Sequence, residues 1–224
     1  MKIKARKAVV LLSGGLDSAT VLYLAKNKGY EPVSLIFDYG QRHRKEIEAA
    51  KNISRKAEVP YRIEKISLPW GGSSLLGKNN KIPRFGKSLP NKIPSTYVPA
   101  RNIIFLSFAL SLAESLKAEA VFIGAHSLDY SGYPDCRRNF LTAFSRAAAL
   151  GTASGVNKQG IKIIAPLINK RKSGIIKLGA RLKVPYRLTW SCYEGGKLPC
   201  GKCDSCYYRA KGFKEANIQD PCCR

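Results

Sequence analysis

Short apolar runs alternate with longer helix-like patterns along most of this 224-residue chain. Such alternation is typical of a mostly parallel sheet whose strands are joined by helices. It predicts a doubly wound α/β domain of the Rossmann-like type, in which ligands bind at the carboxyl ends of the strands. The expected strands are Ala8–Leu12, Pro32–Phe37, Tyr61–Ile66, Ala120–Gly124 and Ile161–Pro166. The clearest helices are Ser18–Asn27, Arg42–Lys56, Asn102–Leu116, Arg138–Leu150 and Lys172–Leu182.

A hexapeptide, Ser13-Gly14-Gly15-Leu16-Asp17-Ser18, lies directly between the first expected strand and the first expected helix. Its glycines let the backbone approach an anion, and the amides and the positive end of the helix dipole attract phosphate. The spacing differs from a Walker loop, which needs Gly-x-x-x-x-Gly-Lys-Ser/Thr. The hexapeptide resembles the pyrophosphate loop of the ATP-pyrophosphatase (PP-loop) superfamily, whose members adenylate a carbonyl oxygen. The alternative is an ordinary helix N-cap behind a glycine turn.

We therefore expect this segment to bind the phosphates of ATP. A carboxylate in a phosphate site repels the substrate unless it holds a magnesium ion or orients a nucleophile, so Asp17 is assigned to positioning the metal-nucleotide. The catalytic candidates are Ser13, Asp17 and Ser18. The candidate ATP-binding residues are Leu12, Ser13, Gly14, Gly15, Leu16, Asp17, Ser18, Ala19 and Thr20.

Four of the seven cysteines lie near the end of the chain with the spacing C-x7-C-x2-C-x2-C. Four thiolates can close a tetrahedron around one ion, which is the arrangement of a structural zinc site with no open position for catalysis. The alternative is an iron-sulfur cluster, but the bacterial ferredoxin run places a further cysteine where this chain has Ala210. The candidate metal ligands are Cys192, Cys200, Cys203 and Cys206.

Two regions depart from the alternating pattern. Residues 69–98 contain several glycines, four prolines and no clear period, which predicts a lid or substrate loop, with partial disorder as the alternative. From Thr189 onward the chain is cysteine-rich and loop-like. We expect a main domain over residues 1–188 and a small zinc-binding region over residues 189–224. Cys222 and Cys223 lie in a terminal segment that we expect to be frayed.

The charge of the chain is strongly basic, with 39 Lys+Arg against 15 Asp+Glu and a net charge of +24. Residues 1–112 hold 20 basic and 7 acidic residues, and residues 113–224 hold 19 and 8, so the excess is spread evenly. An even excess argues against a nucleic-acid-binding arm. It favours either a broad positive surface or the steering of small anionic ligands, and a solvated lysine-rich surface is the plain alternative.

No segment predicts a membrane anchor. The longest uncharged apolar stretch, Ile103–Ala113, is about half the roughly 20 residues that cross a bilayer. The basic start, Met1–Lys7, is followed by too short an apolar run for a signal peptide. We expect a cytoplasmic protein without a membrane partner, in which clustered cysteines favour metal binding over disulfides.

Four further segments complete a specific resemblance. They are Phe37–His43, Pro94–Asn102, Asp129–Arg137 and Thr189–Tyr193. Together with the hexapeptide and the cysteines, and in the same order, they are similar to the motifs of the QueC family of 7-cyano-7-deazaguanine synthases. The resemblance extends from about Val9 to Phe213, which is nearly the whole chain.

The resemblance implies an adenine nucleotide alpha hydrolase type of fold and a carbon-nitrogen ligase. The implied reaction converts 7-carboxy-7-deazaguanine and ammonia to the nitrile with ATP, in the biosynthesis of 7-deazaguanine-modified tRNA nucleosides such as queuosine or archaeosine. It implies Mg²⁺ with ATP, one structural Zn²⁺ per chain and a homodimer. The implied partners are small molecules, so nucleic-acid binding is not required.

The segments that carry the resemblance also supply candidate substrate-binding residues. Asp135 would accept hydrogen bonds from the guanine-like edge, and Tyr97 or Tyr130 would stack on the heterocycle. Arg101 would meet a carboxylate or a phosphate, and Arg137 lies in the same segment as Asp135. The alternatives are a loop cap, core packing and a surface ion pair.

Four other residues are notable. Ala100 stands where the resemblance implies a glycine, which leaves less room for close backbone approach. Cys136 is expected to be a small buried thiol rather than a covalent nucleophile. His43 lies in a matching segment, whereas His126 lies outside one and is assigned no role.

Two other functions compete with this reading. One is a PP-loop enzyme that modifies tRNA directly, by thiolation or lysidine formation, which the basic charge favours and the absence of an RNA-binding appendage disfavours. The other is a non-enzymatic zinc-ribbon protein that binds nucleic acid, which would leave the phosphate loop unexplained.

Overall fold

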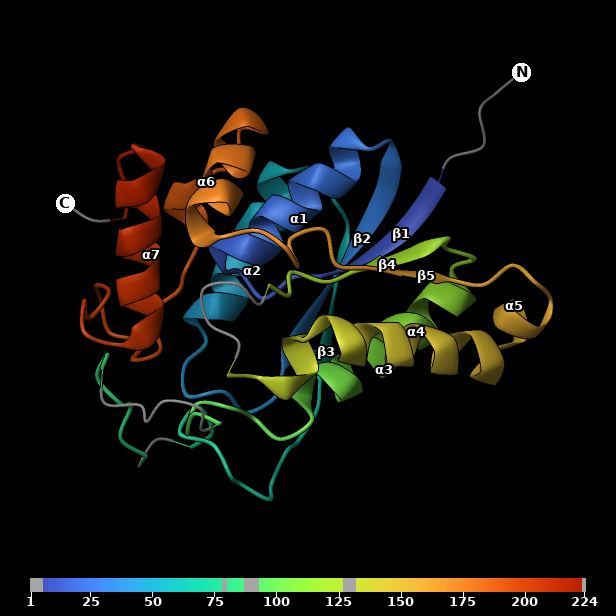
Figure 1. Cartoon of the computed structure of the whole chain (residues 1–224), viewed down its shortest axis with the longest axis horizontal. Coiled ribbons are helices and arrows are strands. Elements are labelled where there is room, and N and C mark those ends of the chain that lie inside the picture. Colours follow the sequence, from blue (N-terminus) through green and yellow to red (C-terminus); the bar gives the residue numbers. More distant parts are fainter. Residues whose placement is uncertain (1–5, 78–79, 87–92, 127–131, 223–224) are drawn as a thin grey trace.

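Five parallel strands form the single sheet of the computed structural model (Figure 1), which describes residues 6–77, 80–86, 93–126 and 132–222. The strand order is β3-β2-β1-β4-β5, and every neighbouring pair is parallel. The sheet confirms the predicted doubly wound class and all the expected strands. The strands are β1 (Arg6–Leu11), β2 (Tyr30–Asp38), β3 (Tyr61–Lys65), β4 (Ala120–Phe122) and β5 (Lys162–Ile164).

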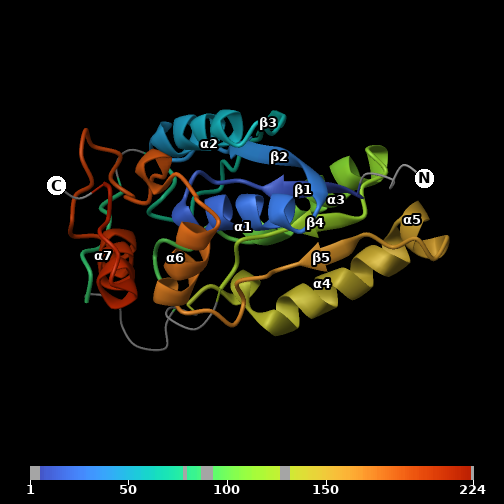
Figure 2. The same ribbon diagram turned by 90° about the horizontal axis from the view of Figure 1, so that it is seen from above.

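Helices cover both faces of this sheet, as Figures 1 and 2 show. One face carries α1 (Leu16–Asn27), α2 (Lys45–Lys56) and α6 (Lys172–Arg181). The other carries α3 (Arg101–Ser115) and α4 (Arg138–Gly151), followed by the short α5 (Ala153–Val156). The five helices expected from the sequence are confirmed to within three residues at each end. None of the helices in the described ranges has the length and apolar character needed to cross a membrane.

The core forms two layers because the central strand is buried on both sides. Ala8 and Val10 of β1 face the α1 layer, whereas Val9 and Leu11 face the α3 layer. A parallel strand covered on both faces has apolar side chains at consecutive positions, which explains the apolar run at the start of the chain. The order of strands reverses between β1 and β4, so a ligand site is expected where these two strands end.

The expectation of a loop-like region after residue 189 is wrong for most of its second half. Helix α7 (Asp204–Ala216) forms there and packs against α6. Arg209, Phe213 and Ala216 are buried at helical spacing. Gly212 allows the close contact, since a Cβ at this position would overlap Lys172 of α6. The start of α7 overlaps the cysteine motif, because Cys203 and Cys206 lie at its first turn. The segment was therefore read as a metal-binding loop and the helix was missed.

The prediction of a frayed chain end is also wrong for the residues up to Cys222, which are held in place by α7. Arg209 and Asp220 form a buried ion pair, with 2.7 Å between Nε and Oδ2. The backbone N–H of Cys222 donates to Asp220 Oδ1 at 3.0 Å, and its thiol packs against Arg209. This pair fixes the last described residues to α7. Cys223 lies outside the described residues.

The described parts of the insertion at residues 69–98 are packed onto the domain. Leu75, Leu76 and Ile82 are buried in the same core layer as α3. The backbone N–H of Phe85 donates to the carbonyl of Lys202 at 2.9 Å. The insertion therefore contacts the cysteine-rich segment as well as the carboxyl edge of the sheet.

The two glycines of the hexapeptide lead to a prediction about stability. Gly14 has a φ of +85°, and a Cβ there would overlap the carbonyl oxygen of Glu46 and lie 2.9 Å from the amide nitrogen of Ala50. Gly14→Ala should therefore destabilise the fold by about 2–5 kcal/mol. In thermal unfolding, the melting temperature should fall by about 5–15 °C.

Gly15→Ala is the matched control for this substitution. Gly15 has a φ of −77°, and its nearest atoms to a new Cβ are 3.5 Å and 3.8 Å away. The melting temperature of this variant should change by less than about 2 °C. Equal destabilisation by the two substitutions would contradict the assigned packing of Gly14 on α2.

Candidate functional site

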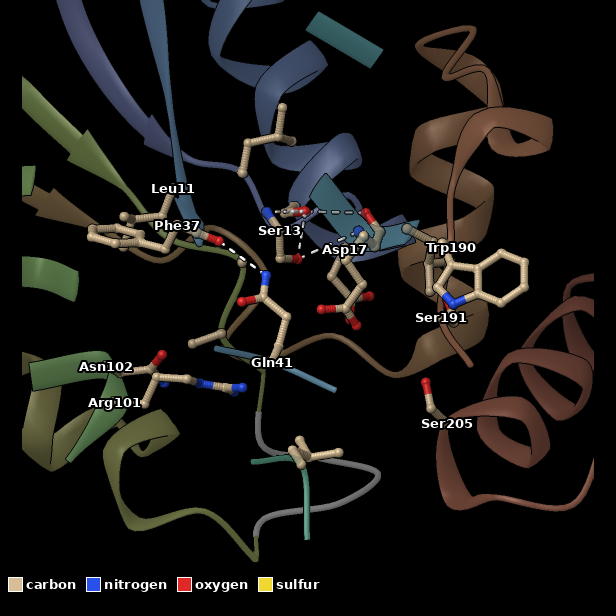
Figure 3. Close-up of a pocket in the computed structure, with 18 of the residues that line it drawn as sticks. Leu11, Ser13, Asp17, Phe37, Gln41, Arg101, Asn102, Trp190, Ser191 and Ser205 are labelled. Carbon is tan, nitrogen blue, oxygen red and sulfur yellow. Dashed lines mark hydrogen bonds between the residues drawn. The ribbon is translucent and has the colours of Figure 1, made fainter. Parts of the chain in front are cut away.

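A cavity of about 320 Å³ opens at the carboxyl ends of β1, β2 and β4. Its walls come from the hexapeptide, the starts of α2, α3 and α6, the segment at 190–193 and the start of α7. Figure 3 shows Ser13 and Asp17 between Arg101 on one side and Trp190 and Ser191 on the other. The cavity lies at the point where the strand order reverses, as the fold predicts.

The hexapeptide is held closed by its own serines. The backbone N–H of Ser13 donates to Ser18 Oγ at 3.2 Å, and Ser18 Oγ donates to the carbonyl of Gly15 at 3.1 Å. The two serine hydroxyls lie 3.0 Å apart. Helix α1 begins at Leu16, so its N-terminal amides and positive dipole end point toward the cavity. The loop is pre-formed for an anion.

The candidate ATP-binding residues divide into two groups. Leu12, Ser13, Gly15, Leu16, Asp17 and Ser18 line the cavity. Gly14, Ala19 and Thr20 are not among the lining residues. Thr20 supports the loop from behind, since its buried hydroxyl donates to the carbonyl of Leu16 at 2.8 Å and contacts Tyr186.

Asp17 forms an ion pair that sequence analysis did not identify. Both of its carboxylate oxygens accept from Lys172 Nζ, at 2.9 Å and 2.8 Å. Lys172 Nζ also donates to His126 Nε2 at 3.0 Å. Burial alone would raise the pKa of Asp17, but Lys172 and His126 outweigh it and hold that pKa well below its usual range. Asp17 is therefore ionised, and it fixes a buried lysine at the cavity wall.

Of the candidate substrate residues, Arg101 lies in the cavity wall, whereas Asp135 is buried beneath the start of α3. Arg101 lines the cavity, and its guanidinium donates to the Tyr39 hydroxyl at 3.3 Å. Asp135 is buried, and its Oδ2 accepts from the backbone N–H of Asn102 at 3.0 Å, at the start of α3.

Tyr97 and Arg137 are not among the described residues that line the cavity. The Tyr97 hydroxyl accepts from the backbone N–H of Ala100 at 3.0 Å. Arg137 is exposed at the N-terminus of α4. Tyr130 lies outside the described residues.

Glu46 is a carboxylate of this cavity that sequence analysis missed. It lies in the first turn of α2, close to Arg101. Burial raises the pKa of Glu46 to about 7, although the charge of Arg101 opposes the shift. Nothing in the sequence marks Glu46 as a cavity residue, because an acidic residue in the first turn of a helix is an ordinary feature.

Aromatic rings line the same part of the cavity. Tyr39, Phe105, Tyr133 and Tyr193 are among them. Tyr133 is fixed by a hydrogen bond of 2.7 Å between its hydroxyl and that of Thr96. This wall offers flat apolar surfaces next to one arginine and one glutamate.

The two unusual residues near α3 have structural explanations. Ala100 has a φ of +54°, in the left-handed region, which is why a glycine is expected at this position. The Cys136 thiol accepts from Asn102 Nδ2 at 3.2 Å, and burial raises its pKa to about 12. A thiol with this pKa stays protonated, which agrees with a packing role rather than a nucleophilic one.

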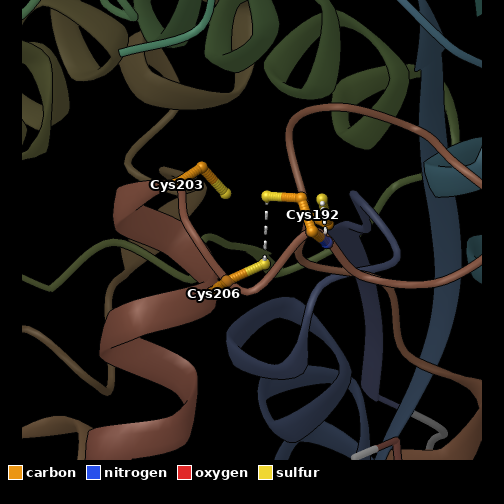
Figure 4. Close-up of side chains that lie close together, drawn as sticks. Cys192, Cys203 and Cys206 are labelled. Atoms are coloured by element: carbon orange, nitrogen blue, oxygen red, sulfur yellow. Dashed lines mark hydrogen bonds between the residues drawn. The ribbon is translucent and has the colours of Figure 1, made fainter. Parts of the chain in front are cut away.

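The four candidate metal ligands converge outside the cavity. The Sγ atoms of Cys192, Cys200, Cys203 and Cys206 all lie within 4.8 Å of one another, as Figure 4 illustrates for three of them. The Cys200 and Cys206 sulfurs are 3.9 Å apart, close to the edge of a tetrahedron around a metal at 2.3 Å. Backbone amides of Glu194 and Cys200 donate to the Cys192 sulfur at 3.4 Å and 3.3 Å. The cluster can therefore hold one metal ion.

The segment at 190–193 joins this cluster to the phosphate loop. The backbone N–H of Trp190 donates to the carbonyl of Gly14 at 2.9 Å. The carbonyl of Cys192 accepts from Trp190 Nε1 at 2.8 Å and from His43 Nε2 at 3.0 Å. His43 thus positions one cysteine of the cluster, and the cluster supports one wall of the cavity.

Comparison with known proteins shows the family. The model of the family described as "Queuosine biosynthesis protein QueC" matches residues 7–217. The 7-cyano-7-deazaguanine synthase of Acetivibrio thermocellus is 56% identical over 216 residues, which are 96% of this chain and 96% of that protein. The 7-cyano-7-deazaguanine synthase of Picrophilus torridus is 55% identical over 215 residues, which are 96% of this chain and 90% of that protein.

Solved structures with lower identity agree on the fold. NMN synthetase from Francisella tularensis has a TM-score of 0.51 at 15% identity, over 96% of this chain and 79% of that one. A 4-thiouridine synthetase in complex with RNA and ATP has a TM-score of 0.53 at 19% identity, over 95% of this chain and 50% of that one. These similarities concern the fold alone. The sequence matches establish that the chain belongs to the QueC family.

Proposed function

We propose that this cavity converts 7-carboxy-7-deazaguanine and ammonia to 7-cyano-7-deazaguanine with ATP. The observation that carries the proposal is one cavity that joins a pre-formed phosphate loop, a buried lysine and a polar aromatic wall. The relatives at 55–56% identity are 7-cyano-7-deazaguanine synthases. They favour this reaction over the direct modification of tRNA, which the charge alone had left open.

The reaction consists of two rounds of adenylation. The substrate carboxylate attacks the α-phosphorus of ATP, a new P–O bond forms, and pyrophosphate leaves. Ammonia then attacks the acyl carbon, loses a proton, and displaces AMP to give the amide. The amide oxygen attacks a second ATP in the same way, and loss of AMP and two protons leaves the nitrile. One site serves both rounds, because each places a carbonyl oxygen at the same phosphorus.

The residues of the cavity divide this work. Ser13 and Gly15 line the part of the cavity where the phosphates would bind, and the start of α1 attracts their charge. Lys172 lies at the same wall, where a cation stabilises the charge that grows on departing pyrophosphate. Asp17 holds Lys172 in place through both of its carboxylate oxygens. Ser18 acts mainly through the loop, since its hydroxyl is bonded to Ser13 and Gly15.

The contacts of Asp17 do not agree with a role in holding magnesium. Both oxygens of Asp17 already accept from Lys172, so this carboxylate does not fit the role of a free magnesium ligand. Magnesium would instead arrive with ATP, bound to its phosphates. No step above depends on a magnesium ligand from the chain.

The cysteine cluster fits a structural zinc ion. Zinc bound there would hold Cys192 against α7 and so stabilise the region at residues 189–224. We retain the division into a PP-loop domain at 1–188 and this zinc-binding region as part of the proposal. A cytoplasmic location and a homodimer accompany it as predictions from the family resemblance.

The product of the reaction tests the proposal. Purified protein mixed with 7-carboxy-7-deazaguanine, ammonium and magnesium ATP should yield the nitrile, AMP and pyrophosphate in the ratio 1:2:2. Mass spectrometry and phosphate chromatography measure the three products. Hydrolysis of ATP to ADP, or the absence of any nitrile, would refute the proposed function.

The Asp17–Lys172 pair predicts a non-additive mutant cycle. Asp17→Asn and Lys172→Met should each lower kcat/KM by about 100- to 1,000-fold, because the first releases the cation from its fixed position and the second removes it. The kcat/KM of the double variant should be no lower than that of the less active single variant, since the two residues act as one unit. Lys177→Met, at an exposed position of α6, should retain full activity. Multiplicative losses would show independent roles.

Removal of one cysteine should remove the metal. Cys203→Ser should lose the one zinc ion per chain and lower the melting temperature by at least about 5 °C. Cys222→Ser, outside the cluster, should retain the zinc. Metal content by mass spectrometry decides the matter, and full zinc occupancy in Cys203→Ser would contradict the assigned ligand set.

A further inference from the structure

Recognition of a 7-deazaguanine requires a defined set of polar partners. The six-membered ring presents one acceptor, O6, beside two donors, N1–H and the 2-amino group. Carbon replaces N7, so an arginine cannot bridge O6 and N7 as it does with guanine. The matching site needs one donor beside a carboxylate, between flat apolar side chains.

Arg101 and Glu46 provide this pair in the described part of the cavity. They come from the starts of α3 and α2, and both side chains line the cavity with Tyr39, Phe105 and Tyr133. Asp135, the carboxylate expected from the sequence, is buried and caps α3 through the amide of Asn102.

The Glu46 carboxylate does not stabilise the fold through contacts with other described side chains. Among the described residues, it forms no hydrogen bond and no ion pair within 4.0 Å, in contrast to Asp17, which is paired with Lys172. A carboxylate that faces a cavity without such a partner disfavours folding, because burial penalises its charged form. A ligand that donates hydrogen bonds would supply the missing partner.

We propose that Glu46 determines specificity for the base by accepting the N1–H and 2-amino hydrogen bonds, while Arg101 donates to O6. This assignment rests on the proposed function and deepens it. It makes the 2-amino group the feature that separates 7-deazaguanines from 7-deazahypoxanthines. An analogue without the amino group leaves one Glu46 oxygen unpaired in the cavity, so the site should reject it.

The test compares two substrates in three proteins. The substrates are 7-carboxy-7-deazaguanine and its analogue without the 2-amino group, and the proteins are the wild type, Glu46→Gln and Glu48→Gln. Glu48 is the matched control, since it is exposed on the same helix and pairs with Lys51. Thermal unfolding and binding of a non-hydrolysable ATP analogue confirm that each variant is folded with an intact phosphate loop.

The expected results follow from the loss of charged hydrogen bonds. The wild type and Glu48→Gln should prefer the amino substrate by at least about 100-fold in kcat/KM. Glu46→Gln should lose about 10- to 100-fold on the amino substrate and much less on the analogue, so its preference should fall below about 10-fold. ATP-analogue binding should be unchanged in both variants.

Two results would overturn the proposal. One is a Glu46→Gln variant that keeps the wild-type preference, with or without an equal loss on both substrates, and the other is a wild type that does not discriminate between the two substrates. Calorimetric binding of 7-cyano-7-deazaguanine and its 2-desamino analogue repeats the comparison without turnover. If the wild type bound both bases with the expected preference but formed no nitrile, the proposed reaction would fail while the role of Glu46 stood. If it bound the two equally, the role of Glu46 would fail.

Discussion

The contact between Gly14 and the first turn of α2 is the constraint on which the site depends. Without a Cβ, Gly14 lies directly against the backbone of Glu46. Its carbonyl accepts from the N–H of Trp190, so the same residue holds the segment that leads to the cysteine cluster. One glycine thus joins the hexapeptide at residues 13–18, the helix that carries Glu46 and the segment of the cysteine cluster. The cavity is the space that these three parts enclose with the starts of α3 and α6.

Local patterns were enough to predict the fold and the phosphate loop. A parallel strand covered on both faces is apolar at consecutive positions, as in Val9 and Val10, and the helices between such strands have a visible period. The hexapeptide and the cysteines are contiguous or nearly so, which keeps their spacing readable. Helix α7 was missed because cysteine ligands and buried positions such as Arg209 share one short segment.

The rest of the site could not be predicted, because it is assembled from distant parts of the chain. Lys172 is 155 residues from Asp17, and only the packing of α6 beside α1 brings them together. The sequence pointed to Asp135, which lies in a segment of the family resemblance, and did not distinguish Glu46 from other helix carboxylates. The structure separates them, since Asp135 caps a helix while Glu46 faces the cavity. Whether a carboxylate has a hydrogen-bond partner depends on the tertiary structure and cannot be read from the sequence.

The proposed reaction requires that an oxygen of the substrate attack the α-phosphorus of ATP in both rounds. Substrate labelled with ¹⁸O in both carboxylate oxygens tests it directly. Each of the two AMP molecules formed per nitrile should carry one ¹⁸O in its phosphate, and the pyrophosphate should carry none. Unlabelled AMP, or label in pyrophosphate or inorganic phosphate, would contradict the account.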